Sequence, residues 1–367
     1  MNKKIYKNLY AFHPGYYVEQ LIEDMEITQE EFALRMGVSA KTISLLVHGE
    51  INLSDDIAMK LSNMFGMSID VWLNLQKEYT KKVLKIEQEK AHDMQKEICS
   101  LIDYSFFTSL GILPTASDAA EKIRNLCSYL KVSSLKALAE PDLLVNFRTG
   151  IKTIEEKNIV NANVWLQTAV NIGRGIDCSE YNEQKLKSSI DEIRSMTLQK
   201  PDSFYPRLVE IFKECGISFV LLPPLKNSGI NGAVKWINNK NVILAINNRM
   251  RYADIFWFSL FHEIKHVMQK KITKTIINGI GYSSNIDADL EKDADLFSRN
   301  TLIPPDCFEE FTESRIFTSS SIIKFAESIQ IHPGIVVGRL INEKLIEPSY
   351  YQNLREKYLI TPNLMLK

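Results

Sequence analysis

Residues 13–79 carry apolar side chains at helical spacing between short polar segments, and this pattern predicts five short helices. His13-Pro14-Gly15 opens the first helix, because a proline fits the first helical turn, where its missing N–H is not needed. Glu31 completes a capping-box pattern with Thr28 at the start of the second helix. Four residues are the predicted caps of the later helices: Thr28, Ser39, Ser54 and Ser68.

The pattern of the following residues predicts more helix and then a small sheet. Residues 77–106 read as a charged helical connector, and residues 115–212 as a mostly helical middle region. After Gly216 three short strand-like runs appear: Ile217–Leu222, Ala233–Ile237 and Val242–Ile246. The polar residues between the last two runs predict a hairpin turn.

Helical periodicity returns for the rest of the chain. The predicted helices are Tyr252–Lys270, Asp287–Thr301, Ser319–Ser328 and Gly334–Lys344. The chain is therefore expected to be mainly α with a small β-sheet, an α+β fold. Its predicted domains are a five-helix domain in residues 1–79, a helical connector and middle region in 80–200, and a C-terminal domain in 201–367.

Composition is that of a globular protein with two or three domains, since 367 residues are 45% hydrophobic and 24% charged. No apolar run approaches the roughly 20 residues that cross a bilayer, and no secretory signal follows the N-terminal lysines. Five scattered cysteines without a CxxC pair favour a reducing compartment. We therefore expect a cytoplasmic protein with no membrane partner.

The sharpest chemical signal is His262-Glu263-Ile264-Lys265-His266, an HExxH motif on a predicted helix. Residues four apart lie on one helix face, so both histidines can bind one zinc ion while Glu263 takes a proton from water. A catalytic zinc needs a third protein ligand, best sought at Glu291 on the next helix, with Asp295 orienting a histidine.

Other interpretations of these residues stay open. The histidines could be an accidental pair in an amphipathic helix, and Glu291 a solvated acid. Three further acids compete for the role of third ligand: Asp287, Asp289 and Asp293. His332 could steady an oxyanion, but a helix-start histidine, as in His13-Pro14-Gly15, is the more economical interpretation.

Residues 200–345 resemble the ImmA/IrrE family of metallopeptidases, whose order of HExxH followed by ExxxD is similar to that of the gluzincins. The resemblance rests on residues 254–263, on Glu291 with Ala294, Asp295 and Phe297, and on Leu302-Ile303-Pro304. It implies zinc ligands His262, His266 and Glu291, with Glu263 as general base. Lys265 departs from the family, in which a small residue is common.

A glycine-containing strand in residues 231–236 resembles the strand beside the cleft of that family. Substrate is expected to pair with it as an extended peptide, if this is an exposed edge strand. Gly232 would let the peptide backbone approach closely. The predicted substrate-binding residues are Gly232, Ala233 and Trp236.

Residues 13–79 resemble the XRE-type helix-turn-helix of HigA-like antitoxins, through Gly37-Val38-Ser39 and Trp72-Leu73-Asn74 among other residues. In that family the third helix enters the major groove of operator DNA. The expected DNA-binding residues are Gln29, Ser39, Lys41, Thr42 and Ser44. Residues 1–79 hold seven basic against eleven acidic residues, which disfavours tight DNA binding and leaves open a dimerisation or partner-binding module.

Together these features predict a DNA-binding transcription regulator, expected to be a homodimer, with a zinc endopeptidase that cleaves a regulatory protein. The alternative is a HigA-like antitoxin or repressor whose peptidase fold serves only as a sensor or binds a cognate toxin. A general cytosolic protease is disfavoured by the fused helix-turn-helix.

Overall fold

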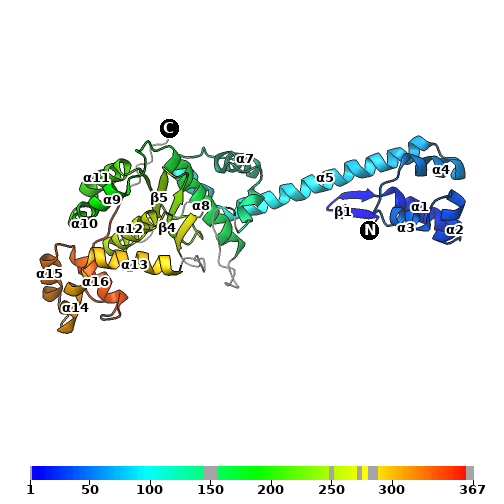
Figure 1. Ribbon diagram of the computed structural model, residues 1–367. Helices are drawn as coiled ribbons and strands as arrows, with labels where there is room; N and C mark the ends of the chain where they lie inside the picture. The colour runs from blue at the N-terminus through cyan, green and yellow to red at the C-terminus, as the bar shows by residue number, and fades with distance from the viewer. Residues whose placement is uncertain are drawn as a thin grey trace. The chain divides into compact units, whose positions relative to one another are not determined.

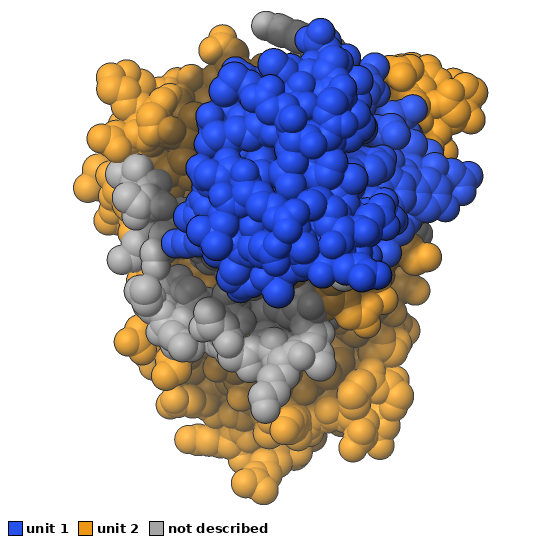
Figure 2. Space-filling view, turned by 90° about the vertical axis from the view of Figure 1, so that its right-hand side faces the viewer, with its two compact units in different colours: residues 1–96 blue, residues 97–367 orange. Residues whose placement is uncertain are grey.

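The computed structural model describes residues 2–141, 143, 155–247, 252–270, 275–279 and 288–360. The chain forms two compact units, Met1–Lys96 and Glu97–Lys367, which Figure 2 colours separately. The described residues are mainly helical with two small sheets, in agreement with the predicted α+β class. None of the helices within these ranges is long and apolar enough to span a membrane.

The first unit starts with an antiparallel hairpin and continues with helices around their own apolar core (Figure 1). Its elements are β1 (Lys3–Tyr6), β2 (Leu9–Phe12), α1 (Pro14–Asp24), α2 (Gln29–Met36), α3 (Ala40–Val47), α4 (Asp55–Phe65) and α5 (Ile69–Leu101), which runs past the boundary of the unit. The five predicted helices are confirmed. The hairpin was not predicted.

Helix caps in this unit follow the sequence closely. The Thr28 hydroxyl accepts a hydrogen bond from the Glu31 N–H at 3.2 Å, and Ser39 and Ser54 cap α3 and α4 in the same way. The predicted capping box is only half formed, because the Glu31 carboxylate pairs with Arg35 one turn further along. The fifth predicted helix and the connector form one helix, α5, since no glycine or proline interrupts residues 69–101.

The second unit contains the remaining elements. They are α6 (Tyr104–Ser109), α7 (Ala119–Leu130), α8 (Glu156–Arg174), α9 (Glu183–Ser188), α10 (Ile190–Ser195), α11 (Pro201–Glu214), β3 (Ile217–Leu222), β4 (Ile230–Trp236), β5 (Val242–Asn247), α12 (Ala253–Met268), β6 (Thr275–Gly279), α13 (Ala288–Leu302), α14 (Pro305–Glu313), α15 (Ser319–Ser328) and α16 (Pro333–Asn342). Short 3-10 turns lie at Leu135–Ala139, Met196–Leu198 and Gln352–Leu354.

A four-stranded sheet with the order β3-β5-β4-β6 organises this unit. β3 runs parallel to β5, with Ile217 opposite Val242. β4 is antiparallel to both neighbours. In the observed register, Ala233 lies opposite Ala245 on β5 and Ile277 on β6. The three predicted strands and the β4–β5 hairpin are confirmed, and β6 is an additional strand that covers the far side of β4.

Each face of the sheet is covered by helices. Val234 and Leu244 join the core shared with α11, α12 and α16, whereas Ala233 and Ile243 join the core shared with α8. The middle region is therefore not separate from the C-terminal region as the predicted division at residue 200 implies. α8 packs against the sheet and also against α7, so residues on nearly all its sides are buried, the polar Asn161, Asn163 and Thr168 among them.

Candidate functional site

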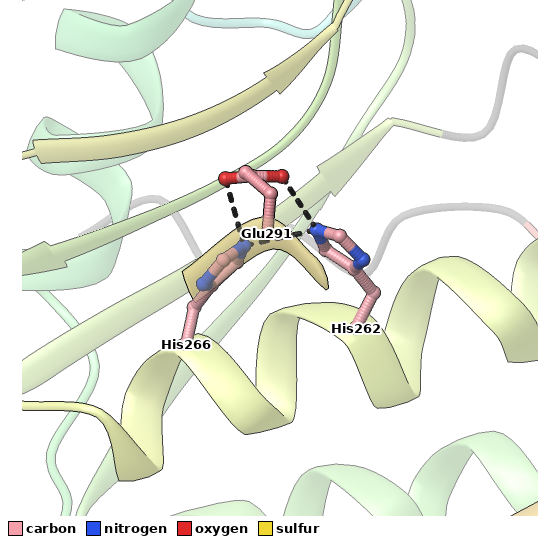
Figure 3. Close-up of side chains that lie close together, drawn as sticks. All are labelled: His262, His266 and Glu291. Carbon is pink, nitrogen blue, oxygen red and sulfur yellow. Dashed lines mark hydrogen bonds and ion pairs between the residues drawn. The ribbon is translucent and has the colours of Figure 1, made fainter. Parts of the chain in front are cut away.

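Two buried histidines on α12 face one another. α12 is fixed by apolar residues such as Leu260 and Ile264, which have no exposed surface in the core beside the sheet. One turn separates His262 from His266, and their Nε2 atoms lie 2.9 Å apart (Figure 3). Two imidazole nitrogens at this distance need a shared proton or a shared cation, because the lone pairs of neutral rings repel.

Glu291, in the first turn of α13, completes the cluster. Its carboxylate oxygens lie 3.2 Å from the Nε2 atom of His262 and 3.2 Å from that of His266. One ligand atom from each of the three residues falls within 4.8 Å of the others. Two imidazole nitrogens and one carboxylate oxygen form the donor set of many catalytic zinc sites, so these residues fit zinc.

Both histidines are oriented through their second ring nitrogen. His262 Nδ1 lies 3.0 Å from Asp295 Oδ1, as the sequence predicted. His266 Nδ1 lies 2.8 Å from Gln269 Oε1, and the Gln269 amide donates to the Leu290 carbonyl on α13. These bonds direct each Nε2 toward Glu291. Gln269 was missed, although its position three residues after His266 on the same helix face could have indicated it.

Glu263 is buried beside the histidines, and neither carboxylate oxygen has a hydrogen-bond partner among the described residues. Burial raises the pKa of Glu263 to about 7, although the two histidines act to lower it. The carboxylate lies against Gly232 of β4, where an added Cβ would come within 2.3 Å of Glu263 Oε1. Only glycine at position 232 leaves room for this carboxylate.

The charges of the cluster reinforce one another. Burial by itself would lower the pKa of His262, but Asp295 and Glu291 raise it to about 10. Burial would raise the pKa of Glu291, but the two histidines lower it to about 2. The cluster therefore favours positive charge between the histidine nitrogens and the Glu291 carboxylate.

The acids that competed with Glu291 lie elsewhere or outside the described residues. Asp293 pairs with Lys265 at 3.2 Å and accepts from the Gln269 amide, so it supports the α12–α13 contact. Lys265, where a small residue is common in the ImmA/IrrE family, thus contributes an ion pair to this contact. Asp289 is exposed. Asp287 lies outside the described residues.

The predicted substrate strand is corrected by the topology. β4 pairs with β5 on one side and β6 on the other, so it has no free edge for a peptide. Ala233 and Trp236 are 1% and 5% exposed and belong to opposite cores. Gly232 is needed for the close approach of Glu263, not of a substrate backbone.

His332 caps a helix. Its Nδ1 accepts from the Gly334 N–H at 3.1 Å at the start of α16, as His13 does for Gly15 at the start of α1. The helix-start interpretation of His332 is confirmed.

The predicted DNA-contacting residues lie on α2, on α3 and at the N-cap of α3 in the first unit. Lys41 and Ser39 are exposed, whereas Gln29, Thr42 and Ser44 are half-buried. The Ser39 hydroxyl accepts from the Thr42 N–H at 3.0 Å and lies 2.7 Å from the Thr42 hydroxyl. The exposed start of α3 therefore presents hydroxyls, backbone N–H groups and one cation, which suits a phosphate backbone.

Comparison with known proteins identifies the first unit. A helix-turn-helix family model matches residues 18–72. The chain is 31% identical over 83 residues to the uncharacterized HTH-type transcriptional regulator YddM of Escherichia coli, covering 23% of this chain and 84% of that protein.

Solved structures similar to this chain include two short proteins. A Pseudomonas aeruginosa protein in complex with its operator DNA is 27% identical and covers 23% of this chain and 90% of its own, with a TM-score of 0.21. An addiction module antidote protein of a HigA family from Coxiella burnetii is 26% identical and covers 22% of this chain and 91% of its own, also with a TM-score of 0.21.

Proposed function

The first unit makes this chain a member of the helix-turn-helix family of transcriptional regulators, and from this premise we propose that it binds operator DNA and also acts as a zinc-dependent endopeptidase. The proposed endopeptidase activity rests on one observation: a ligand atom from each of His262, His266 and Glu291 lies within 4.8 Å of the other two. A buried glutamate follows the first histidine directly, in the order of the ImmA/IrrE and gluzincin peptidases.

Zinc would be held by His262, His266 and Glu291, with Asp295 and Gln269 fixing the two rings. Bound zinc supplies Lewis-acid chemistry, since it polarises a peptide carbonyl and acidifies water. Burial of the histidines on α12 among core side chains helps to hold both rings in place.

Glu263 would serve as general base. Its carboxylate is held between α12 and β4 without a competing hydrogen bond, so it is free to accept a proton from the attacking water. The same carboxyl group would then donate this proton to the leaving amine. Gly232 keeps the carboxylate in place, because any side chain there would displace it.

α3 would read DNA in the first unit. Its exposed N-terminal residues fit the family's recognition helix, whose early side chains contact base edges. We propose a homodimer on two half-sites about one helical turn apart. Because the DNA reader and the peptidase share one chain, the substrate would be a regulatory protein bound near the same operator.

Metal analysis of the purified full chain tests the site. We expect about one zinc per chain in wild type and in Glu263→Gln, and little in His262→Ala or Glu291→Ala, because each of these removes a ligand. Asp289→Ala is the matched control, since Asp289 is an exposed acid near the start of α13. Full zinc occupancy in Glu291→Ala would assign the third ligand to another residue.

Cleavage is tested in cells by comparing wild type with Glu263→Gln. We expect wild type to process either a partner repressor or its own chain and to change reporter transcription, and Glu263→Gln to do neither. Identical reporter output and intact proteins in both strains would favour a repressor or antitoxin that uses the second unit as a sensor or toxin-binding surface.

A further inference from the structure

A cavity of about 160 Å³ lies in the second unit between α12, α13 and α16. Its walls are mostly apolar and come from all three helices and the residue that follows α13: Ile255, Phe258, Leu302, Ile303 and Ile335. An engineered apolar cavity of about 150 Å³ is known to bind benzene. The space therefore suits a six-membered ring or a short branched chain.

Two guanidinium groups also line the cavity and share one carboxylate. Arg299 Nη2 donates to Glu343, and Arg339 Nε lies 2.9 Å from the same Glu343 oxygen without hydrogen-bond alignment. Arg339 Nη1 is buried with no partner among the described residues. The guanidinium of Arg339 is held by stacking over the Phe308 ring at 4.8 Å.

Asp254 is the acid that lines the cavity, and its charge is already balanced. Arg355 binds it with two hydrogen bonds, of 2.7 Å and 3.2 Å. Arg299 and Arg339 share the single Glu343 carboxylate, so one positive charge at the cavity is not balanced. Arg339 also holds a buried N–H donor that lacks an acceptor among the described residues. A ligand with a single negative charge would satisfy both.

We propose that this cavity binds a small apolar monocarboxylate of about the size of benzoate, with its ring against the apolar walls and its carboxylate on Arg339. The cavity adjoins the metal cluster along the α12–α13 contact. Phe258 lies one turn before His262, with 6.3 Å between ring centroids, and Arg299 lies one turn after Asp295. An occupant would thus contact both helices that carry the metal-site residues.

Calorimetric titration of the full chain with sodium benzoate tests the proposal. The titration is run on chelator-treated and zinc-loaded protein, because a carboxylate could also bind zinc directly. We expect one benzoate per chain in both preparations, and at least tenfold weaker binding of benzyl alcohol, which has a similar shape but no charge. Equal affinity for benzyl alcohol, or no saturable benzoate binding to chelator-treated protein, would overturn the site.

Two variants probe the two halves of the cavity. Arg339→Met should weaken benzoate binding at least tenfold by removing the donor, and Leu302→Phe should do so by filling the apolar space. Arg124→Met, at an exposed position on α7, is the matched control and should bind as wild type does. Leu302→Phe keeps the test decisive if Arg339→Met does not fold, and wild-type affinity in folded Leu302→Phe protein would exclude this cavity.

Discussion

Gly232 shows how one missing side chain can position a reactive group. The Glu263 carboxylate occupies the volume that a Cβ at position 232 would need, at 2.3 Å from Oε1. Because Glu263 is fully buried, it cannot move away into solvent. The position of the proposed base is therefore set by β4 as much as by its own helix.

We expect Gly232→Ala to retain zinc and to lose about 100-fold in cleavage rate, the effect of a displacement of about 1 Å at a reacting group. Gly175→Ala is the control, because the nearest atom to its added Cβ is a carbonyl oxygen at 3.3 Å. Zinc content and peptide cleavage are measured on the same preparations. Wild-type cleavage in Gly232→Ala would show that this contact does not position Glu263.

The three residues of the proposed metal site could be chosen from sequence because two of them lie one turn apart on a single helix. Spacing within a helix fixes relative position, so the pairing of His262 with His266 needed no tertiary information. Contacts between elements follow no such spacing. The packing of Glu263 on Gly232 depends on how α12 crosses β4, and the sequence led us to assign that glycine to substrate instead.

At the scale of elements, α3 offers a single basic side chain for the proposed contact with DNA. Lys41 is the single lysine or arginine of Ala40–Val47, and it is exposed. Lys41→Glu should weaken operator binding strongly and flatten its salt dependence, because a phosphate contact becomes a repulsion. Electrophoretic mobility shifts at several salt concentrations measure both effects.

Lys77→Glu, at an exposed position on α5, provides the same change of charge away from α3 and should leave most of the affinity intact. If both variants bind equally well, α3 is not the reading helix.

The unpredicted hairpin is attached to α5 by a charged contact. Tyr6 Oη donates to Asp93 at 2.7 Å, and Lys7 pairs with the same carboxylate. The hydrogen bond from Lys7, followed by that from Tyr6, lowers the pKa of Asp93. The folded unit therefore favours the ionised form, so this stabilisation is present above the ordinary aspartate pKa of about 3.9 and is lost as the pH falls through the lowered value.

Asp93→Asn should accordingly lower the melting temperature of the first unit at pH 7. The substitution should have little effect near pH 2, where the wild-type carboxyl is protonated and therefore uncharged, as the asparagine is. Thermal melts at both pH values measure this, with Glu78→Gln, at an exposed position of α5 within the first unit, as the control. A loss of equal size at both pH values would indicate a packing defect rather than a charge effect.

Helices and strands with a strong period were predicted within a few residues, whereas the β1–β2 hairpin, β6 and the packing partners of β4 and α8 were not. The substrate role assigned to β4 required an exposed edge strand, but β6, which follows α12 in the chain, pairs with the side of β4 that β5 leaves free. The period of β4 identifies a strand but not its neighbours. α8 was expected in a separate middle region, because the sequence of a buried helix does not show which other elements cover it.

At the scale of the whole molecule, each unit has a core of its own. Val18, Phe32 and Trp72 belong to the first core, and the second unit is built on the two faces of its sheet. A ligand that binds one folded unit should therefore stabilise that unit in particular. At about 100 times its Kd, such a ligand adds about 2.7 kcal/mol.

Calorimetric melting of the full chain should show two transitions. Operator DNA should raise the one that belongs to the helix-turn-helix unit, and zinc removal should lower the other. Circular dichroism of Glu291→Ala serves as the control for chelator effects, since its second transition should no longer respond to zinc. A single transition that shifts with both treatments would mean that the units unfold together.

The burial of α8 has a consequence for synthesis on the ribosome. Val164 and Trp165 are covered by a core that includes Val220 and Ile243, which are translated well after them. At roughly 5–20 residues per second, the apolar helix waits several seconds for its cover, while the first unit can already fold. A premature stop between α8 and β3 would therefore yield a polypeptide with a folded DNA-binding end and an exposed apolar tail, which should sediment as aggregate.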